Sequence, residues 1–327
     1  MNDSPGMRAA VLTAPGAFDV TDAPLPVPGP GQVRVRLKGS GLCASNLPAF
    51  EGRPWFDYPM EPGHLGHEGW GTVDAVGDGV TSVRCGDAVA VLSYRAYADY
   101  DLADAAHVVP LPPSLAGQSF PGEALGCAMN IYRRGDVRSD DTVAVVGVGF
   151  LGAALIQLAA RAGARVVAVA RTEAALDLAR RCGASHTLVM DDHQRLLEAM
   201  STYTHGDFCQ RVFECTGKNW PLDLAGEFTG ARGRLVIAGF HQDGMRQVNV
   251  QLWNWRGIDV INAHERDPAI ATEGIRLAVE AVVDGRLDLS LLITHRFPLR
   301  RIGEAMGYVR ARPPGFVKAV VEMEEAT

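Results

Sequence analysis

The sequence lacks the features typical of nucleic-acid-binding, disulfide-rich or exported proteins. Its 38 acidic and 31 basic residues give a net charge of -7, so no basic surface points to nucleic acid or anionic lipid as a partner. Its six cysteines, among 327 residues, show no paired spacing, which favours free thiols or one metal ligand over a disulfide framework. Met1 to Gly6 lack the apolar core of a signal peptide, so we expect a cytoplasmic protein.

A membrane span is not expected either. No formal charge occurs between Asp141 and Arg161, but three glycines lie at the centre of this stretch. There the pattern also changes from a β-branched strand to helical spacing, which a spanning helix of about 20 residues would not do. We therefore expect no membrane partner.

The same stretch predicts a dinucleotide-binding turn. Val143–Val146 is typical of a strand buried in a parallel sheet, and apolar residues keep helical spacing from Leu151 onward. Between them the glycines fit G-x-G-x-x-G, which permits a tight turn, close approach to a pyrophosphate and close packing of helix on strand. Glycine is common here, with 36 residues, but the flanking strand and helix favour dinucleotide binding over chance. The predicted cofactor-binding residues of the turn are Gly147, Gly149, Phe150, Leu151 and Gly152.

The chain has two parts that differ in their predicted secondary structure. From Met7 to about Pro113 short strands alternate with glycine and proline turns, which predicts a barrel-like, mainly β domain. From near Phe120 strands and helices alternate, which predicts a doubly wound parallel sheet. The first part has predicted strands at Arg8–Leu12, Val33–Leu37, Trp70–Val76, Ala88–Val91 and Val108–Leu111. The second part has them at Val143–Val146, Val166–Val169, Arg211–Glu214, Arg234–Ala238 and Ile258–Asn262, with helices at Glu173–Arg181 and Leu222–Phe228.

After His264 the pattern changes again, to helices at Ala271–Asp284 and Leu299–Arg310 and a last strand at Phe316–Glu322. We expect this piece to rejoin the first domain. The predicted organisation is an α/β nucleotide domain, 123–264, inserted into a mainly β catalytic domain, 1–122 and 265–327. A cleft between the two would bring substrate and cofactor together.

Two stretches of the first domain carry candidate metal ligands. Cys43 and His67 lie 24 positions apart, and Glu68 follows at once. Thiolate, imidazole and carboxylate together suit zinc, whose catalytic sites take about three protein ligands and leave one position open. Glu123 or Cys127 could supply a further ligand. Alone, Cys43 would be a small buried hydrophobe and His67 an ordinary hydrogen-bonding residue, but their joint occurrence favours a metal.

Four motifs follow one another in the chain: Cys43-x-Ser45, Gly66-His-Glu-x-x-Gly71, Gly86-Asp-x-Val89 and Gly147-x-Gly-x-x-Gly152. In this order and at these distances they resemble the zinc-dependent medium-chain dehydrogenase/reductase family, nearest its sorbitol- and threonine-dehydrogenase-like branch. The resemblance runs from about Met7 to Met323. It implies a GroES-like catalytic domain, a Rossmann domain, and hydride transfer between a secondary alcohol or ketone and NAD(P).

The resemblance also implies roles for individual residues. Cys43 and His67 would be zinc ligands, and Glu68 an adjacent carboxylate that can ligate the metal or stand beside it. Glu123 is preferred to Cys127 as the further ligand, because it stands ten residues before Arg133, where the polyol branch carries its glutamate. Zinc would lower the pKa of the bound alcohol, whose alkoxide would expel hydride to the nicotinamide.

A proton relay would begin at Ser45, but the sequence departs from the family around it. Asn46 stands where the family usually has an aspartate that orients the zinc-bound histidine. Pro48 replaces a histidine that often ends the relay, and His64 is a candidate substitute. The lobe of four closely spaced cysteines is absent, so we expect one zinc at most.

The cofactor's identity depends on the end of the predicted strand Val166–Val169. Ala170 stands where NAD-preferring relatives usually have an acid, and Arg171 could bind a 2′-phosphate, with Thr172 next to it. These residues favour NADP over NAD, although Arg171 could instead be a solvated surface charge. Gly239 is a further residue expected beside the cofactor.

Two other functions stay open from the sequence. One is a zinc-free quinone- or enoyl-type reductase of the same superfamily, and the other a catalytically inactive NADP(H)-binding sensor. The polar segment Asn262–Asp267 favours a hydroxyl-rich substrate such as a polyol, cyclitol or sugar if it faces the cleft, and is a salt-bridged loop if it does not. The resemblance further implies a homodimer or homotetramer.

Overall fold

The computed structural model describes residues 6–323, which fall into two compact units. Within the described residues, unit 1 comprises 6–126, 266–283 and 293–323, and unit 2 comprises 127–265 and 284–292. Residues 1–5, which carry most of the expectation about a signal peptide, lie outside the described residues. The functional domain limits given above stay a prediction.

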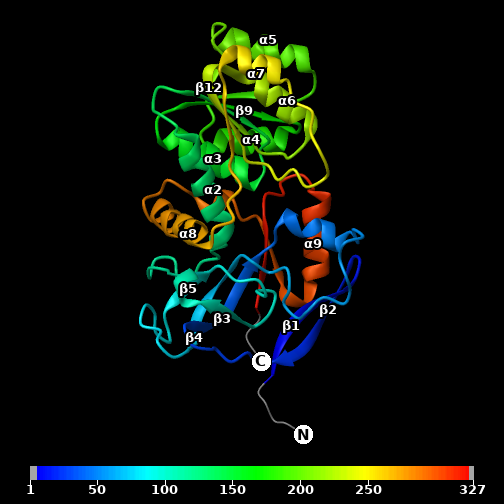
Figure 1. Ribbon diagram of the computed structural model, residues 1–327, viewed down its shortest axis with the longest axis vertical. Helices are drawn as coiled ribbons and strands as arrows, with labels where there is room; N and C mark the ends of the chain where they lie inside the picture. The colour runs from blue at the N-terminus through cyan, green and yellow to red at the C-terminus, as the bar shows by residue number, and fades with distance from the viewer. Residues whose placement is uncertain (1–5, 324–327) are drawn as a thin grey trace. The chain divides into compact units, whose positions relative to one another are not determined.

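Unit 1 is built on a mixed seven-stranded sheet with the order β14-β15-β3-β4-β5-β7, in which β6 also pairs with β3 (Figure 1). A separate hairpin pairs β1 with β2. The strands are β1 (Gly6–Ala14), β2 (Ala17–Pro24), β3 (Gln32–Gly41), β4 (Gly69–Val76), β5 (Ala88–Val91), β6 (Tyr100–Asp104), β7 (Val108–Pro110), β14 (His295–Pro298) and β15 (Ala319–Glu322). The helices are α1 (Leu47–Phe50), α8 (Pro268–Val283) and α9 (Ile302–Ala311), with single 3-10 turns at Ala44–Asn46, Ala105–His107 and Leu299–Arg301.

Alternation of apolar residues decides which face of β3 is buried. Val33, Val35 and Leu37 are buried and share a core cluster with Val89 and Val91 of β5. A second core lies under α9, where the helix packs against β15, so this C-terminal part of the chain joins the first sheet. The antiparallel pairing of β15 with β3 places residues from opposite ends of the chain side by side.

Unit 2 contains a six-stranded parallel sheet with the order β10-β9-β8-β11-β12-β13. Every residue of β8 is buried, as the β-branched run at Val143–Val146 predicts for a strand covered on both faces. The order reverses between β8 and β11, and ligands of such sheets bind outside the carboxyl ends of the strands at this point. The strands are β8 (Thr142–Val146), β9 (Arg165–Ala170), β10 (His186–Val189), β11 (Cys209–Glu214), β12 (Thr229–Ile237) and β13 (Asp259–Asn262).

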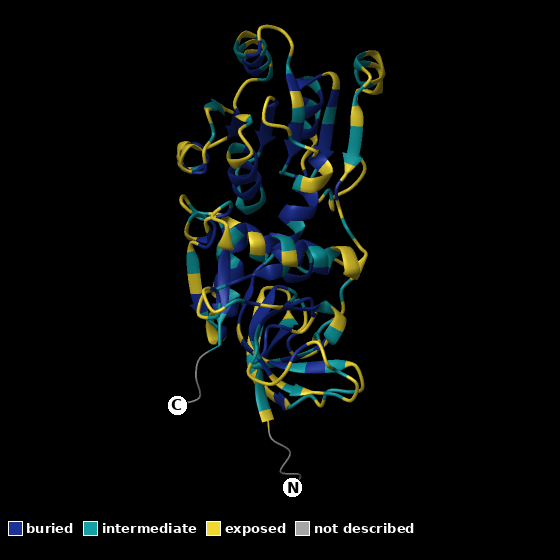
Figure 2. Cartoon of the chain, turned by 90° about the vertical axis from the view of Figure 1, so that its left-hand side faces the viewer, coloured by how far each residue is buried: buried dark blue, intermediate teal, exposed yellow. Residues whose placement is uncertain are grey.

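Helices cover both faces of this sheet. One face packs residues such as Val146 and Val167 against Leu196 and Met200 of α5 and Phe228 of α6. Figure 2 shows the central strands buried and the outer surfaces of the helices exposed. The helices are α3 (Phe150–Arg161), α4 (Glu173–Arg181), α5 (His193–Tyr203), α6 (Asn219–Phe228) and α7 (Val250–Arg256), with a 3-10 turn at Leu289–Leu291. The helix α2 (Gly122–Gly135) begins in unit 1 and continues in unit 2.

The expected fold class is confirmed, and most expected elements are present. The helix α4 has the predicted bounds, and so does β5. The strands β2 and β6 were not predicted, because their sequences are rich in aspartate and only partly buried. No helix among the described residues is long and apolar enough to cross a membrane.

Candidate active site

Three neighbouring strands of unit 1 bring the candidate metal ligands together. Cys43 follows the carboxyl end of β3, and Glu68 directly precedes β4. The pairings Ser40 with Gly69 and Gly41 with Val320 are antiparallel, so the end of β3 lies beside the beginnings of β4 and β15. Residues far apart in the sequence therefore meet at one end of these strands, as Glu68 and Lys318, 250 positions apart, do.

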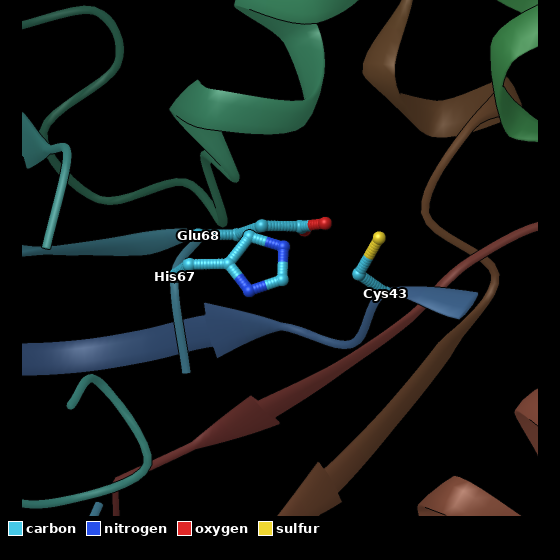
Figure 3. A group of neighbouring side chains, drawn as sticks. All are labelled: Cys43, His67 and Glu68. Atoms are coloured by element: carbon cyan, nitrogen blue, oxygen red, sulfur yellow. The ribbon is translucent and has the colours of Figure 1, made fainter. Parts of the chain in front are cut away.

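The side chains of Cys43, His67 and Glu68 converge (Figure 3). One ligand atom from each lies within 4.8 Å of the others. Glu123, in the first turn of α2, places Oε2 4.0 Å from Nε2 of His67. This helix start is packed so tightly that a Cβ on Gly126 would lie 2.8 Å from the backbone N of Ile275 in α8.

Glu68 is fully buried and is held by a lysine that the sequence analysis did not identify. Nζ of Lys318 donates to Oε1 of Glu68 at 2.8 Å and to the carbonyl of Leu42 at 3.2 Å. Oε2 lies 2.7 Å from the same ammonium, although it accepts no hydrogen bond within the described residues. A Cβ on Gly41 would lie 1.7 Å from Oε2, so only glycine at this position admits the carboxylate.

The backbone orients His67. Its Nδ1 lies 2.9 Å from the carbonyl oxygen of Leu65, which can only accept, so Nδ1 carries the proton and Nε2 is left for a metal. Asn46 donates to the same carbonyl at 3.0 Å and to the hydroxyl of Tyr97 at 2.9 Å. Asn46 thus acts on His67 through Leu65, whose backbone has a left-handed φ of 76°.

The thiol and the imidazole change each other's charge state. Burial by itself raises the pKa of Cys43, but the hydrogen bond and charge of His67, together with Lys318, lower it below its ordinary value. Burial by itself lowers the pKa of His67, but Cys43, Glu123 and Glu68 raise it to about 10. Each group therefore favours the charged form of the other, thiolate and imidazolium, and a metal ion would take the proton's place.

Of the expected relay residues, Ser45 lies beside this group. Ser45 is exposed; its N–H faces Sγ of Cys43 at 3.5 Å, and its hydroxyl lies 3.5 Å from Oδ1 of Asn46. Pro48 is in the first turn of α1. His64, the candidate substitute for the relay histidine, is exposed, three residues before His67.

In unit 2 the glycine turn has the geometry that its spacing predicts. Gly147 directly follows β8 and has φ at +100°, and a Cβ on Gly152 would lie 2.0 Å from the carbonyl oxygen of Gly147. Gly149 is the N-cap of α3, and a Cβ there would meet nothing within 4 Å. The turn is therefore closed on the sheet side and open in front of the helix, where Phe150 and Leu151 begin α3 and an anion is favoured.

The residues expected around the ribose lie at the end of the neighbouring strand. Ala170 ends β9 and is buried, Arg171 is exposed, and Thr172 caps α4 by accepting from the N–H of Ala175. Gly239 follows β12, and a Cβ on it would lie 2.2 Å from the backbone N of Gly217. Within residues 6–323, Arg171 makes no ion pair.

Sequence reasoning missed Lys318 and the carbonyl of Leu65. A lysine inside the apolar run Phe316–Val321 was a usable signal, because a charged residue in a buried strand needs a partner. The carbonyl leaves no trace in the residue types, since every residue carries one.

Two family models of known proteins match this chain, one mainly in unit 1 and one mainly in unit 2. The family model for the alcohol dehydrogenase GroES-like domain matches residues 29–127, and that for the zinc-binding dehydrogenase matches 151–280. D-arabitol-phosphate dehydrogenase of Enterococcus avium is 24% identical over 338 residues, covering 93% of this chain and 94% of that protein. Sorbitol dehydrogenase of Halalkalibacterium halodurans is 25% identical over 340 residues, covering 93% and 96%.

The fold is also similar to that of solved structures. A zinc-binding dehydrogenase from Sinorhizobium meliloti 1021, bound to NADP, superposes with a TM-score of 0.84 at 23% identity, covering 97% of this chain and 99% of that one. Together, the two family matches, the full-length relatives and the gathered Cys43, His67 and Glu123 lead to one conclusion. The chain belongs to the zinc-dependent medium-chain alcohol dehydrogenase family, and it is an NAD(P)-dependent oxidoreductase of alcohols and ketones.

Proposed function

We propose that Cys43, His67 and Glu123 hold a single catalytic zinc ion in this dehydrogenase. The observation that carries the proposal is the convergence of a thiol, an imidazole and two carboxylates, with Glu68 tied to Lys318. Sulfur, nitrogen and oxygen donors of this kind suit zinc.

Charge supports this choice of ligands. A thiolate, a neutral imidazole and the carboxylate of Glu123 together carry two negative charges, which match the charge of Zn²⁺. Glu68 is already neutralised by Lys318 at 2.7 Å, in a site where both side chains are buried. Glu68 therefore stands beside the zinc rather than completing its shell.

Bound zinc supplies a Lewis acid that lowers the pKa of a substrate hydroxyl. The chain's own residues position this chemistry. Leu65 holds His67 in the tautomer that leaves Nε2 available. Ser45, beside Cys43, would take the proton that the substrate hydroxyl loses and at the same time release its own hydroxyl proton to solvent, to which its side chain is exposed. Asn46, within reach of the Ser45 hydroxyl, is the next polar group.

We propose NADP as the preferred nicotinamide cofactor. Ala170 places no carboxylate where a 2′-phosphate would lie, and Arg171 is exposed next to the N-terminus of α4. The test is the ratio of kcat/KM for NADP to that for NAD. Arg171→Ala should lower this ratio by about 10- to 100-fold, the worth of a charge-assisted hydrogen bond. A wild-type preference for NAD would overturn the assignment.

The proposed substrate carries a secondary hydroxyl within a hydroxyl-rich molecule, such as a polyol, a cyclitol or a sugar. Support comes from relatives named as sorbitol and D-arabitol-phosphate dehydrogenases. A panel of such alcohols and of apolar secondary alcohols of similar size tests this class by kcat/KM. Faster turnover of the apolar alcohols would contradict it.

A metal assay tests the zinc proposal directly. We expect one zinc per chain, reduced to a trace in Cys43→Ala, while Cys85→Ala, a change at an exposed cysteine, serves as the matched control and retains it. Glu68→Gln should keep most of the zinc, and Glu123→Gln should lose it. The reverse order for these two glutamates would exchange their roles. A homodimer or homotetramer and a cytoplasmic location stay predictions, the first testable by light scattering.

A further inference from the structure

A buried carboxylate at the end of β11 has no part in the chemistry above. Glu214 is the last residue of β11 and is fully buried. Its carboxylate accepts hydrogen bonds from the N–H groups of Thr216 at 2.6 Å and Gly217 at 3.0 Å. Because an unpaired buried anion is costly, these donors fold the loop that follows β11 around the carboxylate.

A histidine from the next loop completes this set. Nδ1 of His241 accepts from Nε of Arg246 at 3.0 Å, so the proton of the neutral ring is on Nε2, which donates to Oε2 of Glu214 at 3.0 Å. Arg246 also donates to the carbonyl of Gly217 at 3.1 Å and pairs with Asp243. The network therefore links the loop after β11 to the loop after β12.

Few apolar side chains hold the second loop. Met245 is fully exposed, Phe240 is 56% exposed and stacks on His264, and Val248 packs partly against the core at the end of the loop. His241 and Arg246 turn inward, with side-chain exposures of 15% each. The polar network is therefore the side-chain link that ties residues 241–246 to the loop after β11.

The linked loops border the dinucleotide turn. The chain order reverses between β8 and β11, so the turn after β8 and the loop after β11 are neighbours. A Cβ on Gly147 would lie 2.5 Å from Cγ2 of Thr216, which shows how closely they approach. The network thus holds in place the loop that lies against the glycine turn.

We propose that His241 is a positioning residue for the cofactor: by joining Glu214 to Arg246, it holds the loops after β11 and β12 in the arrangement that binds the dinucleotide. This inference rests on the proposed function, in that the turn from Gly147 to Gly152 holds the cofactor. His241 acts through the two loops and touches no reacting atom.

The test is fluorescence titration of NADPH and NADH on the zinc-loaded enzyme, which needs no turnover. His241→Ala removes one donor from a buried carboxylate, so we expect about 10- to 100-fold weaker binding. His241→Gln, whose amide offers a donor and an acceptor, should restore affinity to within about threefold of wild type. Gln242→Ala, at an exposed neighbour on the same loop, is the matched control and should bind normally. The KM for cofactor should rise more than kcat falls.

Each outcome supports or overturns the inference. Normal NADPH affinity in His241→Ala, with or without a lower melting temperature, would show a structural role only and overturn it. If His241→Ala does not fold, Arg246→Ala is titrated instead, because it cuts the other end of the same link and leaves Glu214 its hydrogen bond from His241. Weaker NADPH binding by Arg246→Ala supports the inference, and normal binding overturns it. If the wild-type enzyme binds no dinucleotide, or Gly149→Ala does not weaken binding, the proposed function itself fails. Normal binding by both wild type and His241→Ala would overturn the inference about His241 and leave the proposed function in place.

Discussion

At the scale of single residues, the proposed metal site depends on groups that control the charge of their neighbours. Glu68 and Lys318 are both buried and neutralise each other, so the charge of the proposed ligand set depends on Cys43, His67 and Glu123. The pKa of Cys43 is lowered and that of His67 is raised to about 10. These opposite directions make the thiol unusually reactive when no metal protects it.

Alkylation of the zinc-free protein tests this charge state. A lowered pKa keeps Cys43 a thiolate at pH values where ordinary thiols are protonated, so its rate should fall only as the pH drops through that lowered pKa. Burial raises the pKa of Cys209 to about 12, so this thiol should stay unmodified near neutrality and serves as the internal control. Iodoacetamide labelling across pH 6–9, read by peptide mass spectrometry, is the measurement, and added zinc should protect Cys43. Equal labelling of both cysteines would contradict this charge state.

Asn46 gives a second prediction at this scale. Restoring the family's aspartate with Asn46→Asp removes the donor to the carbonyl of Leu65 and places a buried carboxylate beside it. We expect a loss of about 1–3 kcal/mol in the free energy of unfolding and weaker zinc binding. Denaturant unfolding and zinc competition assays measure the two effects.

Ser45→Ala is the control for stability, because the Ser45 hydroxyl makes only a long contact of 3.5 Å. Tighter zinc binding by Asn46→Asp at unchanged stability would show that residue 46 contacts His67 directly, against the geometry described here.

At the scale of elements, two glycines of the turn between β8 and α3 are expected to have different roles, Gly152 in stability and Gly149 in cofactor binding. A Cβ at position 152 would lie 2.0 Å from the carbonyl of Gly147, so Gly152→Ala must shift backbone and should cost about 1–3 kcal/mol or more. A Cβ at position 149 meets nothing within 4 Å, so the free energy of unfolding of Gly149→Ala should lie within about 0.5 kcal/mol of the wild-type value. Its added methyl occupies space that a pyrophosphate needs, which should weaken NADPH binding by about tenfold or more.

Thermal unfolding and NADPH titration of both variants check this pair. Normal cofactor affinity in Gly149→Ala would mean that the pyrophosphate does not approach the turn. Unchanged stability in Gly152→Ala would mean that the turn relaxes without cost.

At the scale of the whole molecule, the two functions are divided between the units. The proposed zinc ligands all belong to unit 1, and the proposed dinucleotide residues all belong to unit 2. Each unit has its own buried sheet, so neither site is needed to build the other. Loss of the zinc ion should therefore leave the dinucleotide site intact, and loss of the dinucleotide should leave the zinc site intact.

Removal of zinc by a chelator tests this division. We expect turnover to be lost, with secondary structure retained and NADPH affinity changed by less than about threefold, since the metal supplies the Lewis acid and not the fold. Zinc analysis, circular dichroism and NADPH fluorescence on the same sample are the measurements, and added zinc should restore turnover. Full turnover without zinc would favour the zinc-free reductase, and loss of NADPH binding would show that the two sites are coupled.

Much of the fold could be predicted from local pattern. The run at Val143–Val146 and the helical spacing after Leu151 predict β8 and α3, because burial of apolar side chains selects their period. The strand β6 could not be predicted in this way. Its sequence Tyr-Asp-Leu-Ala-Asp is only partly buried, and pairing with β3 rather than propensity makes it a strand.

The sequence by itself determined the kinds of chemistry available: the glycine turn, the residue types of a zinc site, and the alanine and arginine after β9. Each of these is a local property, since a residue's donor atoms and a turn's spacing do not depend on distant segments. Only the tertiary structure decided how they are held. Lys318 reaches Glu68 because β15 and β4 both pair with β3, and His241 reaches Glu214 because β12 lies beside β11. Buried charges need partners, and which partners they find is a matter of strand pairing.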